Sequence, residues 1–132
     1  MGKLDGNLGA MIDRERDRAR GPESDIRTLA AALDSFRSSL GRACAAERAV
    51  RAARIDEQAA AAALAAVSVE FGDDGNGREI QRARVETARA NLARKRAALK
   101  RALLDERRAK SALHTSWQRF EITRGRVAIQ AA

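Results

Sequence analysis

The chain has 132 residues with 26 Lys plus Arg against 18 Asp plus Glu, a formal net charge of +8, so it holds sequence for one domain and not for a multidomain enzyme. Leu, Ile, Val and Phe together number 25, which argues against a large close-packed core. Helix formers dominate, with 30 alanines and 22 arginines, and the chain has no tyrosine and a single proline. This composition excludes β and α/β classes and predicts an all-α fold of long helices.

The first segment, residues 1–23, predicts a short helix. Leu4, Leu8, Met11 and Ile12 share one helical face, and an apolar face needs a surface to cover it. Gly21-Pro22 ends the segment, because proline restricts the residue before it to extended geometry. We expect this helix to pack at the base of a larger hairpin formed by residues 24–132.

The first arm of that hairpin is predicted over residues 24–71. Ser24 or Asp25 can cap the first free backbone N–H groups, and Gly41 is a tolerable interior glycine. A glycine-rich break follows, and its composition predicts the turn of the hairpin. The turn residues are Gly72, Asp73, Asp74, Gly75, Asn76 and Gly77.

The second arm is predicted over residues 78–124. Its apolar residues recur every seven positions from Val85 to Val127, interrupted by Glu106, and a sustained seven-residue period is typical of an antiparallel coiled coil when two arms of similar length flank a short turn. Pairing the apolar stripes of the two arms sets Phe36 opposite Leu113. The predicted core comprises Leu29, Leu33, Phe36, Leu40, Val50, Leu64, Val85, Leu92, Leu99, Leu113, Trp117 and Phe120.

That pairing gives the two ends of the hairpin different character. The middle is rich in alanine and is expected to be weakly held, with Glu57 beside Leu92. Large side chains gather at the end away from the turn, where Phe36, Trp117 and Phe120 are expected to form the main core.

The excess positive charge lies on the second arm. Residues 78–108 carry eleven bases and four acids, whereas residues 24–70 carry six of each. Two rows of arginine at seven-residue spacing are expected to form a basic stripe that either binds a partner or keeps the rod in solution. The rows are Arg82, Arg89 and Arg96, and Arg94, Arg101 and Arg108.

Catalytic, metal and cofactor sites are not predicted. The turn resembles part of an EF-hand loop, but Gly72 and Ala83 stand where the first and last carboxylate ligands belong. Cys44 and His114 each stand alone, so no metal-ligand spacing is present, and Cys44 is expected to be a small packing residue. The longest alanine-rich run, residues 59–69, is too short for a membrane span, and we expect a cytoplasmic protein.

A family resemblance rests on the composition of the arms. Segments such as Arg42-Ala43-Cys44-Ala45-Ala46-Glu47-Arg48 and Ala102-Leu103-Leu104-Asp105-Glu106-Arg107-Arg108 resemble the small central-stalk proteins of type III secretion and flagellar export, the FliJ/YscO-like group, over residues 25–124. The resemblance implies a coiled-coil hairpin that engages a secretion ATPase and an export gate. The glycine-rich turn and residues 1–23 depart from the family pattern.

The sequence therefore favours a non-enzymatic interaction or scaffold protein with a protein partner. A slender charged hairpin offers no concave apolar walls for a small substrate. One alternative is binding of nucleic-acid backbone by the second arm, and a homodimer that pairs two hairpins into a four-helix bundle also stays open.

Overall fold

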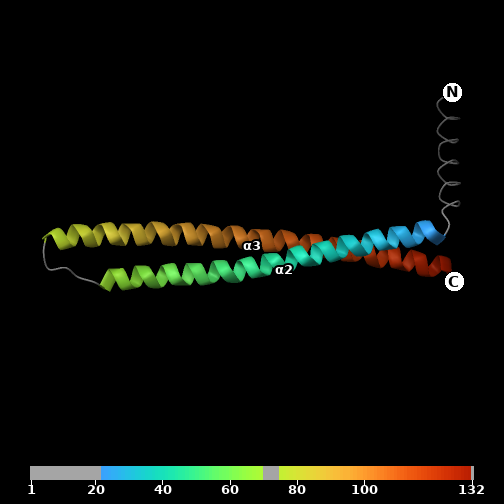
Figure 1. The fold of residues 1–132 in the computed structure, drawn as a ribbon, viewed down its shortest axis with the longest axis horizontal. Coiled ribbons are helices and arrows are strands. Elements are labelled where there is room, and N and C mark those ends of the chain that lie inside the picture. The colour runs from blue at the N-terminus through green and yellow to red at the C-terminus, as the bar shows by residue number, and fades with distance from the viewer. Residues whose placement is uncertain (1–21, 70–74, 132) are drawn as a thin grey trace, which may run out of the picture. The chain divides into compact units, whose positions relative to one another are not determined.

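The structure is a computed structural model and describes residues 22–69 and 75–131. These residues form two helices, α2 (Pro22–Val69) and α3 (Gly75–Ala131). The helices pack against each other as a helical hairpin (Figure 1), which confirms the all-helical prediction. The short helix predicted within residues 1–23 falls on residues outside the described part, apart from the two that open α2.

Helix α2 begins two residues before the predicted start. Proline at the first helical position loses nothing, since its missing N–H would have no intrahelical partner there, and Glu23 and Asp25 place negative charge near the free N–H groups of the first turn. Ser24 is therefore inside the helix instead of capping it. Its carbonyl oxygen accepts a hydrogen bond of 2.9 Å from Thr28 Oγ1.

The turn predicted over residues 72–77 is too long. Helix α3 starts at Gly75, so Gly75, Asn76 and Gly77 are its first residues, while Gly72, Asp73 and Asp74 fall outside the described part. These three residues can open a helix because the first N–H groups of any helix lack intrahelical partners in any case. Poor helix formers are tolerated better there than in a helix interior.

Helix α3 also continues seven residues beyond its predicted end at residue 124. A single interior glycine costs about 1 kcal/mol, which does not end a helix whose next turn is supported by packing. Two residues after Gly125, Val127 is half-buried and continues the seven-residue series. The predicted end at residue 124 was wrong because it assumed that Gly125 ends the helix.

The described residues fall into two compact units. The central unit lies within Ser39–Leu113, and the described part of the terminal unit contains residues 22–38 and 114–131. Each unit contains a stretch of both helices.

The central unit is organised around two series of partly or fully covered residues. Each series advances by alternating steps of three and four residues, and the α3 series contains the predicted positions Val85, Leu92, Leu99 and Leu113. The seven-residue period read from the sequence therefore marks residues that are covered in the structure. We call these two series the seam. Its members are Ser39, Ala43, Ala46, Val50, Ala53, Glu57, Ala60, Leu64 and Val67 on α2, and Gln81, Val85, Ala88, Leu92, Lys95, Leu99, Ala102, Glu106, Ala109 and Leu113 on α3.

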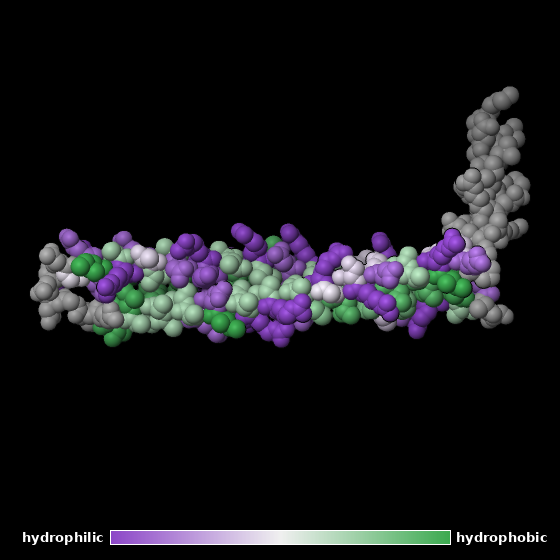
Figure 2. All heavy atoms as spheres, viewed as in Figure 1, coloured by the Kyte–Doolittle hydropathy of each residue, from purple (hydrophilic) through white to green (hydrophobic). Residues whose placement is uncertain are grey.

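Among the described residues, the apolar side chains with the least exposure lie in the alanine-rich middle, which the sequence predicted to be weakly held. Ala43, Val50, Ala60 and Leu92 are only 4 to 6% exposed, and all four belong to the central unit. A small side chain is covered easily by one neighbouring helix, whereas a larger one is enclosed by two helices only where it points directly at the contact between them. Figure 2 shows weakly hydrophobic residues running between hydrophilic side chains in this region.

Contacts across the central unit do not share one offset from the predicted pairing, because Glu57 with Arg96 lies one helical turn from it and Gln81 with Val67 lies within one residue of it. In the central unit Glu57 pairs with Arg96, four residues beyond the predicted Leu92, and the side-chain amide of Gln81 donates to the carbonyl oxygen of Val67. Helix α3 begins beyond the end of α2 (Figure 1). Arg96 therefore supplies a cation to the partly covered Glu57 carboxylate, which offsets the cost of its burial.

The terminal unit contains an aromatic cluster of Phe36, Trp117 and Phe120, three residues that the sequence predicted to lie together. The ring centroid of Phe36 lies 5.2 Å from that of Trp117 and 6.2 Å from that of Phe120. The Trp117 and Phe120 centroids are 5.8 Å apart. These separations are in the range where aromatic pairs attract beyond simple area burial.

Two residues of the predicted core are not buried. Trp117 in the terminal unit and Leu40 in the central unit are each 42% exposed. Leu40 follows the buried Ser39 and Trp117 follows the buried Ser116, so each flanks the contact between the helices instead of entering it. The other predicted core residues are buried or half-buried.

Neither α2 nor α3 has a stretch long and apolar enough to cross a membrane within the described residues.

Candidate interaction surfaces

The arginine rows predicted on the second arm are exposed along α3. All six side chains belong to the central unit, and each is classed as exposed. The seven-residue spacing places successive members of one row about 10 Å apart on one side of the helix. The first arginine row is Arg82, Arg89 and Arg96, and the second arginine row is Arg94, Arg101 and Arg108.

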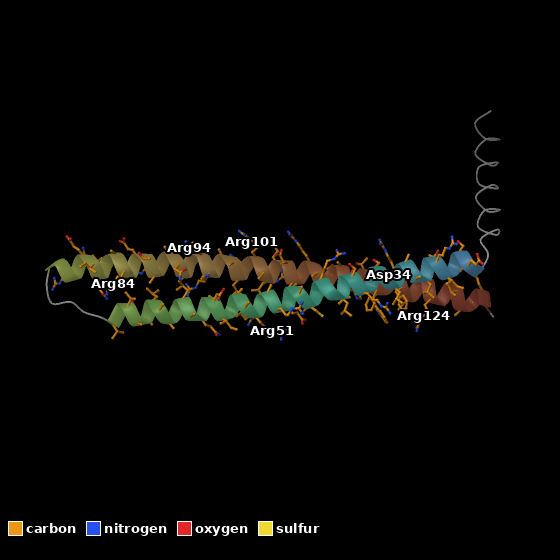
Figure 3. All side chains as sticks on the ribbon, in the orientation of Figure 1. Asp34, Arg51, Arg84, Arg94, Arg101 and Arg124 are labelled. Atoms are coloured by element: carbon orange, nitrogen blue, oxygen red, sulfur yellow. The ribbon has the colours of Figure 1, made fainter. Side chains whose placement is uncertain are left out.

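The two rows do not combine into the single stripe that the sequence suggested. Five residues separate Arg96 from Arg101, which rotates their side chains by about 140° around a continuous helix. The first row directly follows the seam positions Gln81, Ala88 and Lys95. The second row faces away from α2, as Arg94 and Arg101 show in Figure 3.

One member of the first arginine row, Arg96, takes part in a contact between the two helices. Arg96 Nε lies 3.4 Å from Glu57 Oε1 across the seam, and the Glu57 side chain is only 22% exposed. An ion pair at a seam position restricts how the helices can align, because other alignments leave the carboxylate without a cation. Arg96 is therefore a less available partner-binding residue than the sequence suggested.

A second ionic cluster joins the helices further along the central unit. Lys110 Nζ lies 3.5 Å from Glu47 Oε1 on α2 and 3.8 Å from Glu106 Oε1 on its own helix. Glu106 is the charge that interrupts the apolar series, and this contact accounts for its presence at a seam position. The sequence did not identify Lys110.

The second arginine row is better placed for a partner. The helical positions beside it include Ala90 and Ala97, which are small, and Leu104, which is 44% exposed. Among the described residues, no ion pair joins Arg94, Arg101 or Arg108 to a carboxylate. The row thus combines unneutralised charge with apolar surface on the outer side of α3.

Single reactive groups are dispersed over the helices. Cys44 is a free, exposed thiol, which corrects its expected role as a packing residue, and His114 is also exposed. In the part of the chain that the structure describes, no three His, Cys, Asp or Glu side chains come together as a metal site would require.

A groove in the terminal unit was not predicted from the sequence. It encloses about 450 Å³ between α2 and α3. Its lining residues are Thr28, Ala31, Ala32, Ser35, Ser116, Arg119, Ile122, Thr123 and Arg126. The sequence carried a signal only for its α3 side, where Arg119, Ile122, Arg126 and Ile129 follow one another at spacings of three and four residues and therefore share one side of a helix.

Comparisons of the chain with protein-family models, with curated proteins and with solved structures find no match.

Proposed function

We propose that the chain is a non-enzymatic scaffold protein whose helix α3 binds a protein partner. The observation that carries this proposal is the second arginine row, which is exposed, faces away from α2 and is not neutralised within the described residues. Rows of charge at seven-residue spacing match the period at which another helix presents its own side chains. The proposed partner carries acidic residues at that period.

We also propose that the two helices form an antiparallel coiled coil. The alternating three- and four-residue steps of the seam support this, because knobs-into-holes packing requires that spacing on both helices. The contacts of Glu57 with Arg96 and of Glu47 with Lys110 fit a hairpin in which flanking charges fix the alignment.

The finer proposal is a cytoplasmic stalk in a type III secretion export apparatus. It is supported by the resemblance of the arms to the FliJ/YscO-like group and by the hairpin fold that the resemblance implied. In that role the partners are a secretion ATPase and an export gate.

Binding of nucleic-acid backbone is the second candidate, because residues 78–108 carry eleven bases against four acids. Phosphate contacts of this kind weaken steeply with salt. Exposed Leu104 beside the second row favours a protein, because apolar surface gains little against phosphates.

The decisive experiment is a crosslinked pull-down of the full chain from its own cells, with and without nuclease. Recovery of a secretion ATPase or export-gate protein that survives nuclease supports the stalk. Recovery of nucleoid or ribosomal proteins that nuclease removes overturns it in favour of nucleic acid.

A variant set then locates the contact. Changing Arg94, Arg101 and Arg108 together to Gln should weaken binding of the recovered partner by about tenfold. The matched control changes Arg37, Arg48 and Arg51 on α2 to Gln, which removes the same charge from another helix. Equal losses in both variants would show that net charge, and not the second arginine row, drives binding.

A further inference from the structure

The groove of the terminal unit has cationic walls and an apolar floor. Arg119 and Arg126 project from α3, Ala31 and Ala32 contribute small side chains from α2, and Ile122 lies between the two arginines along α3. Arg126 follows Arg119 by seven positions, so their Cα atoms are about 10 Å apart on one side of the helix.

These two arginines are not neutralised within the described residues. Neither Arg119 nor Arg126 forms an ion pair there, and no Asp or Glu lines the groove. Their neighbour Arg124 differs, since its Nη2 lies 2.9 Å from Glu121 Oε2 on another side of α3. The described residues of the groove therefore carry a net positive charge that α2 and α3 do not neutralise.

Several hydroxyl groups of the groove are already satisfied within their own helices. Thr28 Oγ1 donates to the Ser24 carbonyl at 2.9 Å, and Thr123 Oγ1 donates to the Arg119 carbonyl at 2.7 Å. A ligand therefore meets methyl groups and guanidinium groups more than free hydroxyl donors.

The apolar part of this surface is unusually open. Ile122 is 57% exposed, and Ile129, one helical turn beyond Arg126, is 79% exposed. Two isoleucines that alternate with two arginines form a stripe along α3 with no covering residue within the described part of the chain. Covering one such side chain contributes to binding through the hydrophobic effect.

We propose that this groove binds an acidic amphipathic helix of a partner protein. A helix laid between two others can place leucine-type side chains against Ile122 and the alanine floor. Its flanking carboxylates then meet Arg119 and Arg126. The isoleucines favour this occupant over nucleic acid, whose phosphates would pair with the arginines but gain nothing from the apolar stripe. The inference deepens the proposed scaffold function and rests on it, but it concerns a different surface.

The test uses the full chain and synthetic probes in fluorescence anisotropy titrations. The first probe is a labelled peptide of about 20 residues, long enough to be partly helical in water, with leucines at alternating three- and four-residue spacing and glutamates beside them. The second probe replaces every glutamate of this peptide by lysine. The third probe is single-stranded oligothymidylate.

Two pairs of matched variants locate the site. Arg126→Gln removes a groove arginine, whereas its control Arg124→Gln removes an arginine paired with Glu121. Ile122→Ala trims the apolar stripe, whereas Ile26→Ala trims an isoleucine of similar exposure, 61%, that does not line the groove. Circular dichroism shows whether each variant keeps its helices.

The expected result is binding of the glutamate peptide and not of the lysine peptide. Arg126→Gln should weaken that binding by about threefold, Ile122→Ala by about tenfold, and the two controls by less than about twofold. Absence of binding, or equal losses for the groove variants and their controls, overturns the proposal. Tighter binding of oligothymidylate that depends on Arg126 but not on Ile122 also overturns it and assigns the groove to phosphates.

Failure of the groove is distinguishable from failure of the scaffold function. Binding of a cellular partner can be lost on changing Arg94, Arg101 and Arg108 and yet persist on changing Arg126. That result supports the proposed scaffold function and overturns the proposal for the groove.

Discussion

At the scale of single residues, Gly41 is a weak point of α2 that the fold does not need. A methyl group added at its Cα would meet no other atom within 4 Å, and no positive φ is recorded for a described glycine. We therefore expect Gly41→Ala to raise the free energy of unfolding by about 1 kcal/mol, because alanine loses less backbone entropy in a helix. Thermal unfolding followed by circular dichroism measures this. A lower midpoint would show that Gly41 serves a contact outside the chain's own described residues.

At the scale of the helices, a charged residue in the seam lowers the stability of the hairpin but restricts how the two helices align. Glu57 occupies a seam position and is satisfied by Arg96, whose side chain is 65% exposed and needs no partner to remain solvated. Glu57→Leu should raise the free energy of unfolding by about 1 kcal/mol, because an apolar side chain gains more at a partly covered position than this pair does. Chemical denaturation measures it, with Glu86→Leu at an exposed position as the control. A loss of stability in Glu57→Leu alone would show that the ion pair outweighs the burial.

The same scale shows what sequence could predict. The seven-residue period identified the covered residues correctly, because it depends only on local helix geometry. The register was harder to predict, because alanines at many seam positions fit more than one alignment and a few contacts such as Glu57 with Arg96 choose between them. The groove was missed because it requires both helices, and periodicity within one helix cannot show which residues of the other stand opposite.

At the scale of the whole molecule, the two units should respond separately to mutation. Contacts join residues on neighbouring turns of two helices, and chains built this way open locally more readily than globular domains. Phe36→Ala removes the ring shared by both aromatic contacts to α3. Native-state hydrogen exchange should then accelerate at residues 22–38 and 114–131 and stay unchanged in the central unit. Uniform acceleration throughout would instead show one cooperative unit.

Ala43 and Ala60 are buried, so these small residues should tolerate substitution less well than the large exposed residues of the chain. At 5% and 4% exposure these methyl groups fill the space between the helices, so any larger side chain there must push the helices apart. The exposed isoleucines and arginines, by contrast, can be replaced without disturbing the hairpin. Across natural variants of this chain, its smallest side chains should therefore be the most constant for reasons of fold. An exposed large residue that proves equally constant would then report selection for a partner.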